Sequence, residues 1–217
     1  MILFFKAGWG RWFLGVCFLA GLLLLLHHLH AVSTSPLEFL KSPDSNPARV
    51  AVWAILGVCF DLGGLFAFLA ASTILLSRKF PRWFLGESVR LFGRHNSLLA
   101  AAAALMTFLL EEPLFRLYLQ PGLGDELGFR EGILAAAAVF AAFHWSPFTT
   151  VWTIWAFPRF LLLTYAMERG GSPLVPMVAH AVSDFVLILL ISRLGRLGLT
   201  WVRPDVPEPI ADRSAWT

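Results

Sequence analysis

The sequence predicts an all-α membrane protein, a polytopic bundle of about six transmembrane helices. Apolar residues make up 58% of its 217 residues and charged residues only 14%, whereas soluble domains have roughly 45–50% and about 25%. The apolar residues fall in long runs that carry most of the nine Trp and twenty Phe. The net charge of +3 comes from short basic stretches between these runs, so the expected partner is the lipid bilayer and not a nucleic acid.

The six predicted helices follow from the length of the apolar runs. A helix needs roughly 20 mainly apolar residues to cross the hydrocarbon core. Runs that approach this length cover residues 12–30, 50–76, 97–119, 129–145, 150–167 and 174–191. The first run also has the pattern of a cleaved signal peptide, and a first spanning helix explains the same residues.

The basic residues in short loops predict an integral membrane protein of the inner or plasma membrane with both termini in the cytoplasm. Cytoplasmic loops carry an excess of Lys and Arg. With six spans and the N-terminus inside, the inner segments hold Lys6, Arg11, Arg78, Lys79, Arg82, Arg90, Arg94, Arg193, Arg196, Arg203 and Arg213. The outer segments hold only Lys41, Arg49, Arg130 and Arg169. Residues 80–96 mix aromatic and basic side chains, which indicates a helix in the inner interface.

Ionisable residues within the apolar runs are the functional candidates, because a charge near the bilayer centre costs ~2.5–3.5 kcal/mol. They are Asp61, Glu111, Glu112, Arg116, His144, Arg159, His180 and Asp184. All but Asp61 lie between residues 111 and 184. This distribution predicts a single polar cluster that is built from four helices.

The third run contains two adjacent carboxylates with different predicted surroundings. Glu112 and Arg116 lie on one helix face at i,i+4, where they can pair, while Glu111 is rotated by ~100°. A carboxylate without a cationic partner in such a place can serve as a general base. The alternative is a structural Glu–Arg clamp with a spare Glu at the interface.

Two histidines, one at the end of the fourth run and one within the sixth, are further candidates. His144 follows Phe140 at the end of the fourth run, where a lone His beside Trp is often an interfacial residue. His180 and Asp184 share a helix face at i,i+4. A carboxylate can hold an imidazole in one tautomer, behind a catalytic or a metal-bound histidine or in a pair that serves packing alone.

Together the motifs Glu-Glu-x-x-x-Arg, Phe-x-x-x-His and His-x-x-x-Asp, in that order and each within its own apolar run, resemble those of the CPBP family. This family comprises type II CAAX prenyl endopeptidases and bacteriocin-processing proteins, and is also called Abi. The stretch 167–173 before the last run also looks like the family's turn. We therefore expect variable transmembrane helices and the basic interfacial segment in residues 1–96, the catalytic helix core in 97–195, and a disordered cytoplasmic tail in 196–217.

The resemblance implies an intramembrane endopeptidase that hydrolyses a membrane-associated peptide or protein. Position by position, Glu111 and His144 would activate the water, and Glu112 with Arg116 would brace the helix. His180 and Asp184 would stabilise the oxyanion, and Phe140 would be a structural support residue. Two positions depart from the family. Leu117 replaces a Gly, and Asp184 stands where Asn is common; an ionised Asp cannot donate a hydrogen bond, so it would orient His180 or be protonated.

No cofactor is expected, although zinc is an alternative. Glu111, His144 and His180 could form the His₂Glu set of a catalytic zinc site. The chain lacks His-Glu-x-x-His, and the candidate ligands come from three helices, which favours a glutamic-type mechanism over a zinc metalloprotease. A second group, His27, His28 and His30, is expected to be interfacial without a ligand role.

Two other functions remain open, a non-catalytic scaffold or immunity protein of the same fold and a small ion-coupled transporter.

The depths of Glu111 and His144 in the bilayer also need explanation. At 1.5 Å per residue, Glu111 lies ~21 Å along its run, whereas His144 ends an antiparallel run. The two residues can meet only if the third run starts in the interface or the loop 120–131 dips into the bilayer.

Overall fold

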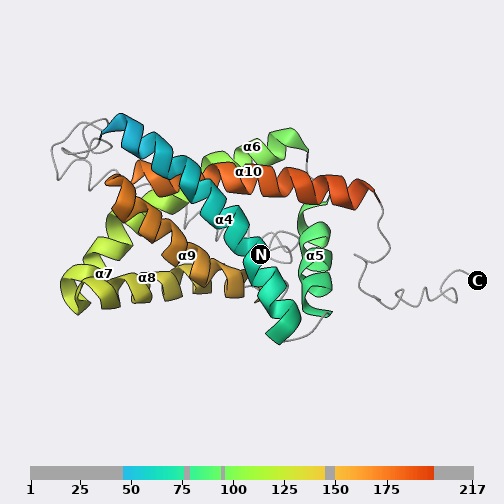
Figure 1. Ribbon diagram of the computed structural model, residues 1–217, viewed down its shortest axis with the longest axis horizontal. Helices are drawn as coiled ribbons and strands as arrows, with labels where there is room; N and C mark the ends of the chain where they lie inside the picture. The colour runs from blue at the N-terminus through green and yellow to red at the C-terminus, as the bar shows by residue number, and fades with distance from the viewer. Residues whose placement is uncertain (1–45, 76–78, 94–95, 145–149, 198–217) are drawn as a thin grey trace, which may run out of the picture.

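The computed structural model describes residues 46–75, 79–93, 96–144 and 150–197, and all regular elements in these ranges are helices. This result confirms the all-α prediction. The elements, labelled as in Figure 1, are α4 (Pro47–Leu75), α5 (Lys79–Phe92), α6 (Ser97–Met106), η1 (Thr107–Glu111), η2 (Leu114–Leu119), α7 (Gln120–Leu127), α8 (Phe129–Phe143), α9 (Thr150–Gly170) and α10 (Leu174–Arg196). The predicted first helix, its His cluster and most of the predicted tail lie outside the described residues.

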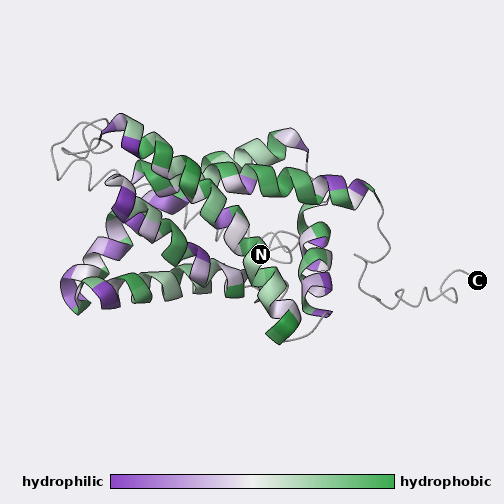
Figure 2. Ribbon diagram, in the orientation of Figure 1, coloured by the Kyte–Doolittle hydropathy of each residue, from purple (hydrophilic) through white to green (hydrophobic). Residues whose placement is uncertain are grey.

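Three helices in the described ranges are long and apolar enough to cross a membrane. They are Pro47–Leu75, the continuous stretch Ser97–Leu127, and Leu174–Arg196, which correspond to the second, third and sixth predicted runs. The fourth and fifth runs form α8 and α9; α8 has 15 residues and α9 contains Arg159. Figure 2 shows hydrophobic residues along most of α4, α6 and α10, and hydrophilic residues gathered on α7 and at the end of α10.

The helix Ser97–Leu127 changes direction at its centre. Both η1 and η2 are π-helical, and the amide of Glu112 bonds to the Thr107 carbonyl, five residues back. Pro113 lies between the two π-helical stretches and lacks an amide hydrogen. Such wide turns and prolines are common causes of helix bends. As a result α6 runs beside α10, while α7 turns away to pack on α8 (Figure 1).

A tight helical hairpin brings the third and fourth runs together, and it replaces the loop predicted at 120–131. The helix continues to Leu127, and Gly128 makes the turn with φ +95°. A Cβ on Gly132 would lie 2.5 Å from the Gly124 backbone, so only Gly allows this approach. Glu111 lies 17 residues before Gly128 and His144 16 residues after it, which explains how the two residues reach the same depth.

Two buried aromatic clusters fix the helices around the site. Phe115, Phe140 and Phe160 pack together with small alanines of α8 and join η2, α8 and α9. Phe84 of α5 packs with Leu65 and Trp155. The predicted interfacial segment is therefore a helix, α5, that contacts α4 and α10 through its apolar face.

Candidate active site

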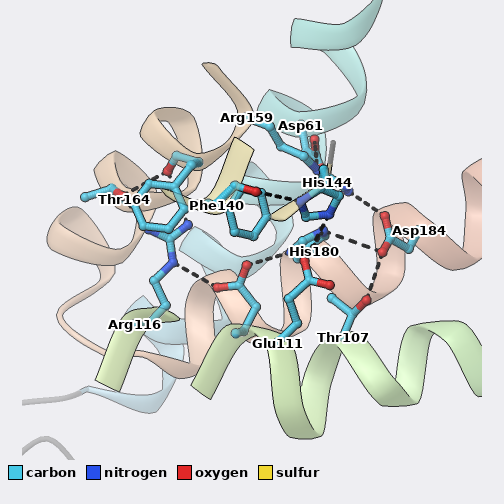
Figure 3. Close-up of polar contacts among 12 residues, drawn as sticks. Asp61, Thr107, Glu111, Arg116, Phe140, His144, Arg159, Thr164, His180 and Asp184 are labelled. Atoms are coloured by element: carbon cyan, nitrogen blue, oxygen red, sulfur yellow. Dashed lines mark hydrogen bonds and ion pairs between the residues drawn. The ribbon is translucent and has the colours of Figure 1, made fainter. Parts of the chain in front are cut away.

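Three predicted side chains from three helices meet at one point. Glu111 ends η1, His144 caps α8, and His180 lies in α10. Oε1 of Glu111 lies 3.5 Å from Nε2 of His144 and 3.8 Å from Nε2 of His180. Figure 3 shows the two imidazoles and the carboxylate turned toward one another. The sequence patterns that predicted a shared cluster are thus brought together in space.

The His144 imidazole is held in one orientation by its own helix. Its Nδ1 lies 2.8 Å from the Phe140 carbonyl oxygen. Because a carbonyl oxygen only accepts, Nδ1 carries the proton, and Nε2 faces Glu111. The Phe140 ring packs against the imidazole with 4.5 Å between the ring centroids.

Glu112 lies in a sealed polar cluster, a group of buried polar side chains next to the point where Glu111, His144 and His180 meet. Nε of Arg116 donates to Oε2 of Glu112 at 2.9 Å, and both side chains are fully buried. This ion pair is the predicted one. The remaining guanidinium donors of Arg116 reach Gln120, Thr164 and the Phe160 carbonyl, and the guanidinium lies 3.7 Å above the Phe160 ring centroid.

Glu112, and not Asp184, makes the short hydrogen bond that orients His180. Nδ1 of His180 donates to Oε1 of Glu112 at 2.6 Å. Oδ2 of Asp184 lies 3.5 Å from Nε2 of the same ring, which is too long for a charge-assisted hydrogen bond. The sequence pattern His-x-x-x-Asp placed the two residues on one face, but the hydrogen bond to His180 that was expected from Asp184 is made by Glu112 of the first motif.

Asp184 is instead part of an ionic network that the sequence motifs did not reveal. Its Oδ1 lies 2.7 Å from Nη2 of Arg159, and the Thr107 hydroxyl donates to Oδ2 at 2.9 Å. Arg159 also binds Asp61 of α4 through two nitrogens. The only signal in the sequence was that Asp61 and Arg159 are opposite charges within separate apolar runs.

The two faces of the site differ in their access to the surroundings. The side chains of Glu111 and His144 are 20% and 26% exposed, while those of Glu112 and His180 are at most 1% exposed. Oε1 of Glu111 is itself buried and has no hydrogen-bond partner among the described residues. The carboxylate and imidazole that a reacting group can reach are therefore those predicted to activate water.

The metal alternative was tested against the geometry of the donors. Glu111, His144 and His180 offer the oxygen and nitrogen atoms that zinc prefers. Within the described ranges, however, no three His, Cys, Asp or Glu side chains form a group that could hold a metal ion. As placed, the side chains of Glu111, His144 and His180 do not fit a metal site.

The part of the chain that carries these residues resembles CAAX-type intramembrane proteases. Residues 93–186 match the family model described as type II CAAX prenyl endopeptidase Rce1-like. The match confirms the CPBP resemblance, and it includes all three motifs but not α4. No curated protein and no solved structure matches the chain.

This family match and the apolar helices indicate an integral membrane protein with a CAAX-protease-like peptidase core. Proteins of this class act on membrane-associated protein substrates. The family match indicates the class of reaction, and the geometry of the site bears on the roles of single residues.

Proposed function

We propose that the protein is an intramembrane endopeptidase in which Glu111 and His144 activate a water molecule to hydrolyse a peptide bond. The observation that carries the proposal is the position of Glu111 Oε1. It is buried, accepts no hydrogen bond from the described residues, and faces Nε2 of both histidines. A water that bridges Glu111 and His144 would satisfy this oxygen and would be poised for deprotonation.

The proposed reaction starts with proton transfer from this water to the Glu111 carboxylate. The water oxygen forms a bond to the scissile carbonyl carbon, and the carbonyl electron pair moves onto its oxygen. The carbon–nitrogen bond then breaks as protonated Glu111 returns its proton to the leaving amine. His144 accepts a hydrogen bond from the water through Nε2 and fixes the direction of attack.

His180 is the proposed donor to the developing oxyanion. Its Nδ1 proton is bound by Glu112, so Nε2 donates only from the doubly protonated ring. Carboxylates of Glu111, Glu112 and Asp184 lie within 3.8 Å of this ring. A preorganised cation of this kind stabilises the charge that appears in the transition state.

The test uses an internally quenched farnesylated peptide that ends in a CAAX sequence, with purified protein in liposomes and product analysis by mass spectrometry. We expect cleavage within the CAAX sequence by the wild type and none by Glu111→Gln. An unprenylated peptide of the same sequence tests whether the lipid is required. Folded wild type that leaves both peptides intact would contradict the peptidase proposal and favour the non-catalytic scaffold.

Zinc-dependent hydrolysis is the alternative that the residue types Glu111, His144 and His180 suggest, although these side chains do not form a group that could hold a metal ion in the described ranges. Prolonged chelation separates the two candidates. The proposed glutamic-type reaction keeps its rate after chelation. Activity that is lost and returns on addition of zinc would establish the metal-dependent candidate.

The transporter alternative has less support from the geometry. Asp61 is paired with Arg159, and Glu112 is paired with Arg116, so the charges within the helices are neutralised locally and do not form an open relay. The cytoplasmic location of both termini remains our proposal, and it rests on the distribution of Lys and Arg between the loops.

A further inference from the structure

We infer that Arg159, anchored by Asp61, is a positioning residue that prevents Asp184 from capturing Nε2 of His180. This inference rests on the proposed function, because it concerns the donor to the oxyanion. It assigns a role in the site to α4, which lies outside the residues that match the family.

Arg159 of α9 is fixed by Asp61 of α4. Nε of Arg159 lies 2.8 Å from Oδ1 of Asp61, and Nη2 lies 2.6 Å from Oδ2. Both side chains are at most 6% exposed. Paired hydrogen bonds of this kind fix the plane of the guanidinium as well as its position. The same Nη2 can therefore hold Asp184 at a defined place.

Asp184 is held by donors on both of its carboxylate oxygens. Arg159 binds Oδ1 at 2.7 Å, and Thr107 donates to Oδ2 at 2.9 Å. In this position Oδ2 stays 3.5 Å from Nε2 of His180 (Figure 3). A free carboxylate would close this gap to the ~2.7–2.9 Å of a charge-assisted hydrogen bond. The proton that His180 offers to the oxyanion would then be taken by Asp184.

The negative charge of Asp184 explains why Arg159 and its anchor Asp61 are needed in this protein. Asp61 and Asp184 are two carboxylates that share one guanidinium. Removal of Arg159 alone would leave two carboxylate charges inside the helix bundle without a cationic partner. Such a variant would fold poorly even if Arg159 had no role in the reaction. A neutral Asn at 184 has no negative charge with which to capture the imidazolium, so the need for Arg159 should disappear with that charge.

The test compares a double and a triple variant in the farnesylated-peptide assay. The double variant is Arg159→Met with Asp61→Asn, which removes the guanidinium together with its anchor and leaves Asp184 with the hydrogen bond from Thr107 but without its cationic partner. The triple variant adds Asp184→Asn. Folded yield and melting temperature are measured for both, and kcat and KM are measured on the folded fraction.

We expect the double variant to lose about 10²–10³-fold in kcat, the typical loss for one oxyanion donor, with little change in KM. The triple variant should recover to within about tenfold of the wild type. A folded double variant as active as the triple would show that Arg159 is only structural. A folded triple variant as inactive as the double would show that Arg159 acts on the substrate directly.

Arg159→Lys decides the question if the double or triple variant does not fold. Lysine keeps a cation between the two carboxylates, so kcat should stay within about tenfold of the wild type in a folded protein. A loss in Arg159→Lys as large as that in Glu111→Gln, at wild-type melting temperature, would overturn the inference. Wild type and Glu111→Gln are run alongside, because an inactive wild type would contradict the proposed function and not this inference.

Discussion

Glu111 and Glu112 are neighbours in the chain, yet they lie in opposite surroundings. Glu112 is fully buried and accepts hydrogen bonds from Arg116 and His180 on its two oxygens. Glu111 is 20% exposed, and its Oε1 has no hydrogen-bond partner in the described part of the chain. In the proposed mechanism the buried carboxylate of Glu112 holds the structure in place, and the more exposed carboxylate of Glu111 activates the water. The surroundings, and not the residue type, separate the two roles.

The helix itself produces this difference. Consecutive side chains point ~100° apart, so the Glu112 carboxylate reaches Arg116 and Nδ1 of His180. The Glu111 carboxylate lies beside Nε2 of His144 and Nε2 of His180. The π-helical turn before Glu112 and the proline after it adjust these directions further. The comparison can be tested separately on the open side, which carries Glu111 and His144, and on the sealed side, which carries Glu112 and Arg116. A third test concerns the hairpin of α7 and α8.

The largest expected effect on the open side comes from His144→Ala. Its Nε2 is 3.5 Å from Glu111, and its side chain is 26% exposed. Loss of the residue that positions the water for deprotonation by Glu111 should lower kcat about 10²–10⁴-fold. The melting temperature should change little, because the side chain is not in the core. A variant with wild-type kcat would remove His144 from the mechanism.

On the sealed side, Arg116→Ala should act mainly on stability. The substitution leaves Glu112 as a buried charge whose remaining partner is His180, and breaking a buried pair typically costs ~3–5 kcal/mol. Folded yield and melting temperature in detergent report this loss. Arg90→Ala is the matched control, because Arg90 pairs with Glu87 on the exposed side of α5. Equal melting temperatures for the two variants would contradict a sealed cluster.

The smallest expected effect concerns the hairpin that brings the open side together. Gly132→Ala would place a methyl group 2.5 Å from the Gly124 backbone, and overpacking of this kind costs ~1–3 kcal/mol. The shift of α8 should also move His144 and lower kcat modestly. Gly122→Ala is the control, since nothing lies within 4 Å of its added Cβ. If both variants melt alike, the close approach of α7 and α8 is not a constraint.

Much of the architecture could be predicted, because helix periodicity and apolar length are local properties of the sequence. The pair of Glu112 with Arg116 followed directly from i,i+4 spacing, and the structure confirms it. The helix from 120 to 127 was not predicted, because Gly122 and Gly124 suggested a loop. The packing of α7 on α8 outweighs the weak helix propensity of these glycines.

The contacts between distant helices could not be predicted. The bond from His180 to Glu112 joins residues 68 positions apart, and the bond from Arg159 to Asp61 joins residues 98 positions apart. The local pattern favoured the nearer carboxylate, Asp184, as the partner of His180. The way the helices cross decides that Glu112 reaches Nδ1 of His180 and that Asp184 faces its Nε2.

The most direct test of the account is the rate of peptide cleavage by Glu111→Gln, measured beside Glu112→Gln at equal amounts of folded protein. Gln keeps the size of each side chain and removes its charge. We predict that Glu111→Gln melts like the wild type but loses about 10²–10⁴-fold in kcat, whereas Glu112→Gln loses stability first, because Arg116 then becomes an uncompensated charge. Wild-type cleavage by Glu111→Gln would contradict the assignment of Glu111 as the general base.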